Sequence, residues 1–134
     1  VMLKLENAQP SGSFKLRGIG ATCAAAKAAG ASEIVSSSGG NAGLAAAYAA
    51  RALGLPCEVC VPSSTPEFVR ARLESYGAKV TVHGSQWAEA NAFAEKVCAE
   101  RNGAMVHPFE GEATWDGNAS LVDEIKEQLG GAEP

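Results

Sequence analysis

The chain has 134 residues, of which 46% are hydrophobic and 19% are charged, and its formal net charge is −4. This composition is typical of a folded globular domain and excludes an intrinsically disordered chain. The acidic balance provides no basic surface for nucleic acid, and no apolar run reaches the roughly 18 residues that a membrane span requires. We therefore expect neither nucleic acid nor a membrane as a partner.

Short β-type runs alternate with longer helical stretches along the chain. The expected strands are Val1–Leu5, Glu33–Ser36, Cys57–Pro62, Lys79–His83 and Met105–His107. The expected helices are Phe14–Ala29, Ala42–Leu53, Pro66–Tyr76, Trp87–Arg101 and Asn118–Leu129. Left-handed positions after helices are expected at Gly30, Gly54, Gly77 and Gly103. This alternation predicts an α/β fold, in which a three-layer parallel sheet carries helices on both faces. Because the sequence opens within an expected strand and without methionine, we expect it to be part of a longer one.

The chain contains four cysteines, Cys23, Cys57, Cys60 and Cys98. The spacing of Cys57 and Cys60 occurs in zinc and redox sites, but both residues fall in an expected strand. Residues three apart on a strand point to opposite faces, so this pair cannot hold one ion. We expect no metal, and small buried thiols in a reducing compartment. Since no secretion signal is visible, the expected location is cytoplasmic.

The first candidate for chemistry is the segment Ser11–Gly18, which reads Ser-Gly-Ser-Phe-Lys-Leu-Arg-Gly. Ser11 or Ser13 can cap the helix that follows, which places Lys15 in the first turn. The helix dipole disfavours a cation there, and the nearest carboxylate, Glu6, lies nine residues back. The positive end of a helix favours the uncharged amine, which is what a Schiff-base lysine requires. The alternative interpretation is a solvated surface lysine.

The second candidate is the segment Ser36–Gly43, which follows an expected strand and opens a helix made almost wholly of alanine. Its small residues let a ligand approach the backbone N–H groups, and a helix N-terminus favours an anion such as a carboxylate or phosphate. Asn41 can donate and accept hydrogen bonds at once. The spacing matches neither a P-loop nor a Rossmann dinucleotide motif. The alternative is a plain strand-to-helix turn with a serine cap.

In this order, Leu5–Gly18, Ser37–Gly43, Ala47–Arg51 and Trp115–Ser120 resemble the pyridoxal-phosphate-dependent L-serine/L-threonine dehydratases. The resemblance is to the serine dehydratase branch of the tryptophan-synthase-β fold type, and it extends over nearly the whole chain. It implies that residues 1–134 form one α/β domain or part of one, similar to the small domain of a fold-type II enzyme. Residues 1–30 would carry the lysine segment, and residues 31–129 the small-domain-like part.

The resemblance also implies roles for individual residues. Lys15 corresponds to the lysine that binds pyridoxal 5′-phosphate as a Schiff base and then acts as the base at the substrate Cα. Phe14 corresponds to the aromatic residue beside the cofactor ring, and Asn41 to the asparagine that hydrogen-bonds the ring's 3′ oxygen. The loop that receives the substrate α-carboxylate corresponds to Ser38, Gly39, Gly40, Asn41 and Ala42.

The implied reaction is α,β-elimination of L-serine or L-threonine to pyruvate or 2-oxobutyrate and ammonia. Serine racemases carry a second base, a serine, at the position of Gly39, so the resemblance favours elimination over racemisation. The pattern Lys-x-Arg-Gly also differs from that of the cysteine synthases, and Trp115–Ser120 resembles the serine branch more than threonine deaminases. A small amino acid as substrate and a homodimer are the expected partners. A threonine deaminase, a serine racemase or a non-catalytic module that binds an anion or a partner remain alternatives.

The glycine-rich phosphate cradle of the family does not occur in this sequence, since Gly130-Gly131 is too short for one. We therefore expect the isolated chain to be inactive. Trp87 and Trp115 are interpreted as packing residues, and Asp123-Glu124 as part of a solvated helix face. His107 lies where the last expected strand enters a loop, and it either packs there or reaches the substrate side.

Overall fold

The computed structural model describes residues 1–130. Its centre is a sheet of four parallel strands in the order β3-β2-β1-β4, namely Lys79–Val82, Cys57–Val61, Ile34–Ser36 and Ala104–Met105. Pairing of Ile34 with Cys57 on one side and with Ala104 on the other sets the register. Within the described residues, no helix combines the length and apolar character that a membrane crossing needs.

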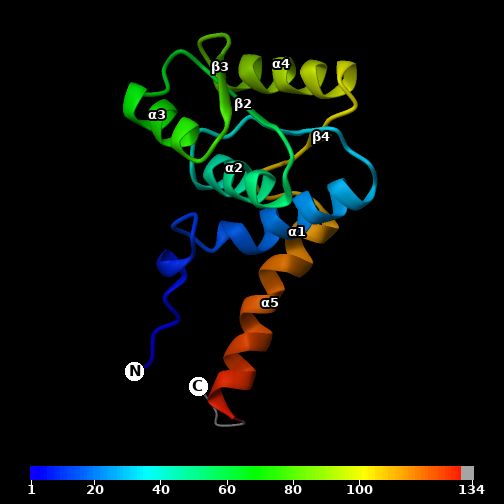
Figure 1. Ribbon diagram of the computed structural model, residues 1–134. Helices are drawn as coiled ribbons and strands as arrows, with labels where there is room; N and C mark the ends of the chain where they lie inside the picture. Colours follow the sequence, from blue (N-terminus) through cyan, green and yellow to red (C-terminus); the bar gives the residue numbers. More distant parts are fainter. Residues whose placement is uncertain (131–134) are drawn as a thin grey trace.

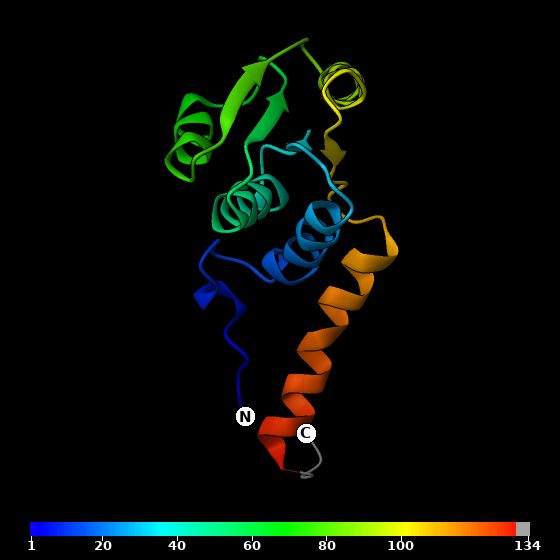
Figure 2. The same cartoon turned by 45° about the vertical axis from the view of Figure 1, so that its right-hand side comes forward.

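Helices cover both faces of the sheet, which confirms the three-layer architecture. The helices α2 (Asn41–Leu53) and α3 (Glu67–Ser75) lie on one face, and α4 (Trp87–Glu100) lies on the other (Figures 1 and 2). The apolar side chains between the sheet and α2 form the main core, which includes Ile34, Val59 and Leu73. A smaller core joins Val35 to Val97 on the α4 side. Burial on both faces explains why the central strands β1 and β2 are mostly apolar, whereas the partly exposed edge strand β3 alternates polar and apolar residues.

Two further helices lie below this layered unit in Figure 1. The helix α1 (Lys15–Ala28) packs against α2, and α5 (Glu112–Leu129) crosses α1 and then extends away from the sheet. Gly18 and Gly117 meet at the crossing, where a Cβ on Gly117 would lie 2.8 Å from the Gly18 Cα. A Cβ on Gly18 would overlap the Thr114 carbonyl oxygen. Only glycine lets the two backbones approach this closely.

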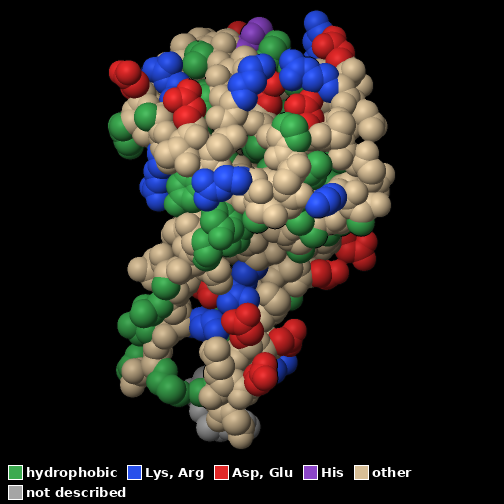
Figure 3. Space-filling model, viewed as in Figure 1, with side chains coloured by type: hydrophobic (Ala, Val, Ile, Leu, Met, Phe, Trp, Pro, Cys, Tyr) green, Lys and Arg blue, Asp and Glu red, His purple; other side chains and the backbone are tan. Residues whose placement is uncertain are grey.

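The N-terminal segment differs from the expectation. Val1–Leu5 is not a strand; it is extended chain that precedes a short 3₁₀ helix, η1 (Glu6–Ala8). Figure 3 shows hydrophobic side chains along the surface of this segment, of which Val1, Met2, Leu3 and Leu5 are exposed. Residues of this type favour a strand only when a neighbouring strand can pair with them. No described strand pairs with this segment, so it does not form one.

The other expected elements are present, with three changes toward the C-terminal end. The strand β4 is Ala104–Met105 and not the expected Met105–His107, so His107 lies beyond it. The helix α5 begins at Glu112 instead of Asn118, because Gly117 serves the crossing with α1 and does not break the helix. Left-handed residues do follow the helices at Gly30, Gly54 and Gly77, but after α4 the residue with positive φ is Asn102 and not Gly103. Glycine at position 103 lets the backbone pack closely against β1, since an added Cβ would lie 3.2 Å from side-chain atoms of Glu33 and Val35.

The four cysteines are free thiols; Cys23, Cys57 and Cys60 are buried as expected, whereas Cys98 is only partly buried. Cys57 lies in the main core with Cys23, whereas Cys60 lies in the smaller core on the α4 side. The two members of the pair therefore point to opposite faces of the sheet. Burial raises the pKa of Cys57 and of Cys23 to about 12, which keeps both thiols protonated and unreactive near neutral pH.

Candidate active site

Lys15 is the first residue of α1, as predicted from its segment. No side chain caps this helix, so the expected capping by Ser11 or Ser13 is wrong. Both serine hydroxyls are buried, and neither has a hydrogen-bond partner among the described residues. The Lys15 amine donates a hydrogen bond to the Pro108 carbonyl oxygen at 2.6 Å. The first turn of α1 contains no acidic residue that competes for the amine.

Phe14 lies beside this amine with its ring accessible. The Lys15 Nζ atom is 5.3 Å from the centroid of the Phe14 ring, and 42% of Phe14 is exposed. An exposed aromatic face next to a primary amine is suited to stacking against a flat ligand. The expectation that Phe14 packs beside a cofactor ring is therefore compatible with its position.

The second motif forms a tight turn between β1 and α2. The Ser38 Oγ atom accepts a hydrogen bond from the Gly40 backbone N–H at 3.2 Å, and Gly40 is the residue before the first turn of α2. Asn41 begins the helix and is exposed, whereas Ala42 is buried. The first N–H groups of a helix lack partners within it, so this turn presents donors to an anion.

The close packing of the turn against α2 explains why position 43 is glycine. A Cβ at this position would overlap the Ser38 carbonyl oxygen and would lie 3.3 Å from the Leu73 side chain. At Gly39 a Cβ would lie 3.3 Å from the Thr65 Cγ2 atom. The glycine at position 43 is therefore required by the close approach of the turn to the helix.

The helix α3 contacts both motifs. The Tyr76 hydroxyl, just after α3, donates a hydrogen bond to the Pro10 carbonyl oxygen at 3.1 Å, ahead of the lysine segment. Leu73 of α3 packs against Gly43 in the first turn of α2. Segments that lie about 30 residues apart in the sequence are thus held against the same short helix.

The sheet topology brings the loops that carry these groups to one edge. β1 lies between β2 and β4, and the chain leaves β1 toward β2 while β4 is added on the opposite side. Parallel sheets bind ligands outside the carboxyl ends of their strands at such a switch point. The turn at Ser38 follows β1, and Pro108, which accepts from Lys15, follows β4. No hydrogen bond joins Lys15 directly to the Ser38–Ala42 turn within residues 1–130.

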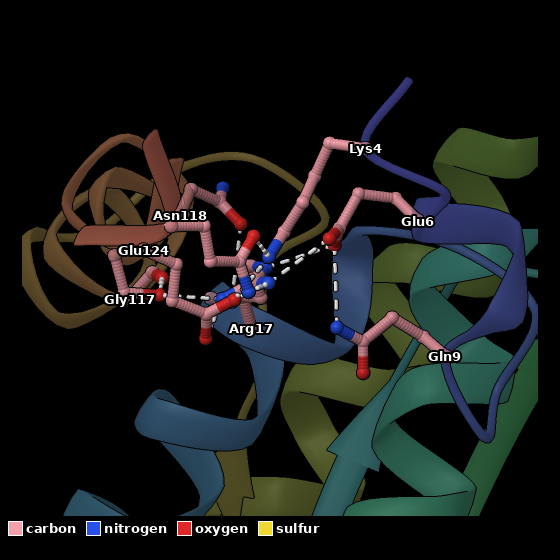
Figure 4. A network of polar contacts seen from close by, with 10 residues as sticks. Lys4, Glu6, Gln9, Arg17, Gly117, Asn118 and Glu124 are labelled. Atoms are coloured by element: carbon pink, nitrogen blue, oxygen red, sulfur yellow. Dashed lines mark hydrogen bonds and ion pairs between the residues drawn. The ribbon is translucent and has the colours of Figure 1, made fainter. Parts of the chain in front are cut away.

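Arg17 organises a charged cluster that the sequence did not reveal. Figure 4 shows its guanidinium between two carboxylates: it contacts Glu6 at 2.8 and 2.9 Å and Glu124 at 2.7 and 2.9 Å. Lys4 adds a bond to Glu124 at 2.7 Å, and the Arg17 side chain is only 8% exposed. The cluster joins the N-terminal segment, α1 and α5, so it fixes the start of the lysine helix.

The electrostatics of this cluster follow from its contacts. Hydrogen bonds from Arg17 and then Lys4 lower the pKa of Glu124 to about 2, and Arg17 also lowers the pKa of Glu6. The two carboxylates in turn raise the pKa of Arg17. The Glu124 side chain is 44% exposed, in line with the expected solvated face at Asp123-Glu124, but it also pairs with Arg17 and Lys4. No local pattern could show this pairing, since Arg17 and Glu124 are 107 residues apart.

The two tryptophans and His107 lie at partly exposed positions. Trp115 does not pack in a core, since 56% of it is exposed; its indole N–H donates to the Phe109 carbonyl oxygen at 2.9 Å. Trp87 is also about half exposed. His107 lies beyond the end of β4, in the loop that contacts Lys15. Among the described residues, no cluster of three or more His, Cys, Asp or Glu side chains is arranged to hold a metal.

Comparisons with known proteins identify the family. A family model described as "Pyridoxal-phosphate dependent enzyme" matches residues 1–134. The chain is 49% identical over 131 residues to the human protein named L-serine dehydratase/L-threonine deaminase, and 48% identical over 129 residues to the serine dehydratase-like protein of Rattus norvegicus. Each alignment covers 96% of the chain but only 40% and 39% of the two relatives.

A solved structure agrees with these relatives. The fungal L-serine ammonia-lyase from Rhizomucor miehei superposes with a TM-score of 0.85 at 37% identity, over 98% of this chain and 42% of the other. The chain thus spans about two fifths of the proteins that it matches. Sequence, fold and the order of the two motifs lead to the same conclusion: the chain belongs to the family of pyridoxal-phosphate-dependent enzymes, beside its serine dehydratase-like members.

Proposed function

We propose that this chain provides the lysine and the carboxylate-binding turn for α,β-elimination of L-serine, with L-threonine as a second substrate. The products are pyruvate or 2-oxobutyrate and ammonia. One observation carries the proposal: the Lys15 amine contacts the Pro108 carbonyl oxygen and so reaches the edge where β1 and β4 end. The names of the relatives supply the reaction.

The residues at this edge fit pyridoxal phosphate. Lys15 offers a primary amine to an aldehyde, and the exposed Phe14 ring beside it offers a surface for a flat pyridine ring. Within residues 1–130 the buried hydroxyls of Ser11 and Ser13 have no hydrogen-bond partner, and such groups gain a hydrogen bond when a polar ligand is placed against them. When bound, the cofactor supplies an electron sink for negative charge at the substrate Cα.

The chain's own residues then divide the work. The Lys15 amine removes the proton at the substrate Cα, because its contact with Pro108 places it at the carboxyl end of β4, beside the exposed Phe14 ring. The turn formed by Ser38, Gly39, Gly40, Asn41 and Ala42 binds the substrate carboxylate at the N-terminus of α2. The Asn41 amide donates to the ring oxygen and so orients the ring.

Gly39 decides between elimination and racemisation in this proposal. A racemase needs a second base on the opposite side of the substrate, and Gly39 has no side chain to exchange a proton. The space around it is also limited, since a Cβ there would lie 3.3 Å from Thr65 and 3.5 Å from Val61. Proton return from the second face is therefore disfavoured.

The experiment is a titration of this chain with pyridoxal phosphate, followed by visible absorbance of the covalently bound cofactor. We expect the absorbance in the wild type and in Lys27→Ala, and its loss in Lys15→Ala. Lys27 is the matched control because it lies on the same helix and is exposed. Addition of L-serine, but not of L-lactate, changes the absorbance, since only an amine displaces Lys15. Equal absorbance in wild type and Lys15→Ala contradicts the proposal. It is the result that a non-catalytic module would give.

A further inference from the structure

The loop after β4 is organised around one imidazole ring. The Nδ1 atom of His107 accepts hydrogen bonds from the backbone N–H groups of Phe109 at 3.3 Å and Glu110 at 3.0 Å. The His107 ring also meets the Phe109 ring edge to face, with centroids 4.5 Å apart. Both donors belong to exposed residues, and within residues 1–130 the imidazole is the acceptor that ties their N–H groups into the turn.

Two carbonyl groups of the same turn accept hydrogen bonds from side chains of α1 and α5. The Pro108 carbonyl oxygen accepts from Lys15 Nζ at 2.6 Å, and the Phe109 carbonyl oxygen accepts from Trp115 Nε1 at 2.9 Å. Proline fixes its own φ, so the direction of the Pro108 carbonyl depends on how the next peptide units are held. Those units are the ones that donate to His107.

We propose that His107 is a positioning residue: by holding this turn closed, it directs the Pro108 carbonyl oxygen at Lys15 and so sets where the lysine amine rests. Without the Nδ1 acceptor, the N–H groups of Phe109 and Glu110 turn to solvent and the carbonyl loses its direction. The consequence for catalysis rests on the proposed function of Lys15. The contact itself does not, so its test needs no cofactor.

The test compares the reactivity of two lysine amines on one helix. Each donates to a backbone carbonyl oxygen, Lys15 to Pro108 and Lys27 to Leu53 at 2.5 Å, but only Lys15 contacts the His107 turn. Reductive methylation with formaldehyde and cyanoborohydride, followed by peptide mass spectrometry, gives a rate for each amine. His107→Ala removes the acceptor, whereas His107→Asn keeps one, because an asparagine oxygen accepts from N–H groups two and three residues on.

In His107→Ala we expect the methylation rate of Lys15 to rise about fivefold, the effect of losing one net hydrogen bond. The Lys27 rate stays constant, and His107→Asn returns Lys15 to within about twofold of the wild type. An unchanged Lys15 rate in folded His107→Ala overturns the proposal, and so does a His107→Asn variant that behaves like His107→Ala. If the methylation rates are as expected but the wild type does not bind the cofactor through Lys15, only the proposed function is contradicted.

A second measurement on the wild type covers the case in which His107→Ala does not fold. The Glu110 amide is held by His107 Nδ1 although its residue is exposed, so its hydrogen exchange should be slower than in an unstructured peptide by about tenfold or more. Protection of this size supports the closed turn. Exchange at the rate of a free peptide overturns it.

Discussion

At the scale of single residues, the turn before α2 depends on glycines that lack a Cβ atom. Gly43 allows the Ser38 carbonyl oxygen to lie where a Cβ would be, and this contact shapes the turn that we assign to the substrate carboxylate. Gly40, in the same turn, has only the Ser38 Oγ atom within 4 Å of such a Cβ, at 3.8 Å. The two glycines therefore differ in what they would tolerate.

Gly43→Ala should lower the free energy of unfolding by about 2 kcal/mol, because the added methyl group must displace the turn. Gly40→Ala is the matched control and should lose less than about 1 kcal/mol, since alanine fits there but is a poorer residue before a helix. Urea denaturation of both variants measures the difference. Equal losses in the two would show that the turn does not press on Gly43.

The Arg17 cluster makes stability depend on acid. The pKa of Glu124 is lowered in the folded state to about 2 from a usual value of 4.5, so its contribution is complete above about pH 5 and is lost as the pH falls toward 2. Replacing Glu124 with Gln should therefore flatten the decrease of the melting temperature between about pH 5 and pH 2.

The control for this change is Asp123→Asn, because Asp123 is the neighbouring carboxylate and is exposed. Its variant should follow the wild-type pH profile. Thermal unfolding monitored by circular dichroism across this pH range gives the comparison. An identical slope in Glu124→Gln and wild type would mean that the pairing with Arg17 does not stabilise the fold.

At the scale of elements, the sequence was informative wherever periodicity and local signals act alone. The strands β1 to β3 and the helices α1 to α4 begin and end within one residue of the ranges expected from composition, because sheet burial and helix-ending glycines are local features. The errors occur where distant segments decide. Val1–Leu5 has strand composition but no partner strand among the described residues, and Gly117 appears as a break until α1 lies against it.

The candidate site divides in the same way. The lysine at a helix start and the glycine-rich turn at the next helix are local patterns, so both could be assigned to their elements in advance. The Pro108 contact of Lys15 and the charged cluster of Arg17 involve residues 93 and 107 positions away, and no spacing rule reaches that far. Capping by Ser11 or Ser13 was also a local expectation, and it failed because α1 begins at Lys15, which places Phe14 and not a serine at the N-cap position.

The crossing of α1 and α5 gives a prediction for the two helices. Gly18→Ala should destabilise the chain by about 2 kcal/mol, since its Cβ would overlap the Thr114 carbonyl oxygen and crowd Asn118 at 2.7 Å. Gly20→Ala, on the same helix, meets only Leu16 at 3.9 Å and should stabilise it by up to about 1 kcal/mol. Chemical denaturation distinguishes them, and a shift of the same sign in both would contradict the close crossing.

At the scale of the whole molecule, this chain spans about two fifths of the relatives that it matches. It holds no run of more than two glycines, and a phosphate group bound without a cradle of backbone N–H groups is held weakly. We therefore expect this chain, given pyridoxal phosphate and L-serine, to form pyruvate no faster than the same mixture without protein. Turnover at the rate of the Rhizomucor miehei enzyme, measured in parallel, would contradict this.

The proposed site depends on one lysine, Lys15, reacting with the cofactor aldehyde. The most direct measurement incubates the chain with pyridoxal phosphate, reduces it with borohydride and maps the modified peptide by mass spectrometry. We expect the pyridoxyl group on Lys15 in preference to every other lysine, because within residues 1–130 it is the lysine that lies beside Phe14 at the edge where β1 and β4 end. Modification spread evenly over the lysines, with Lys15 no more reactive than Lys27, would contradict the assignment of this site.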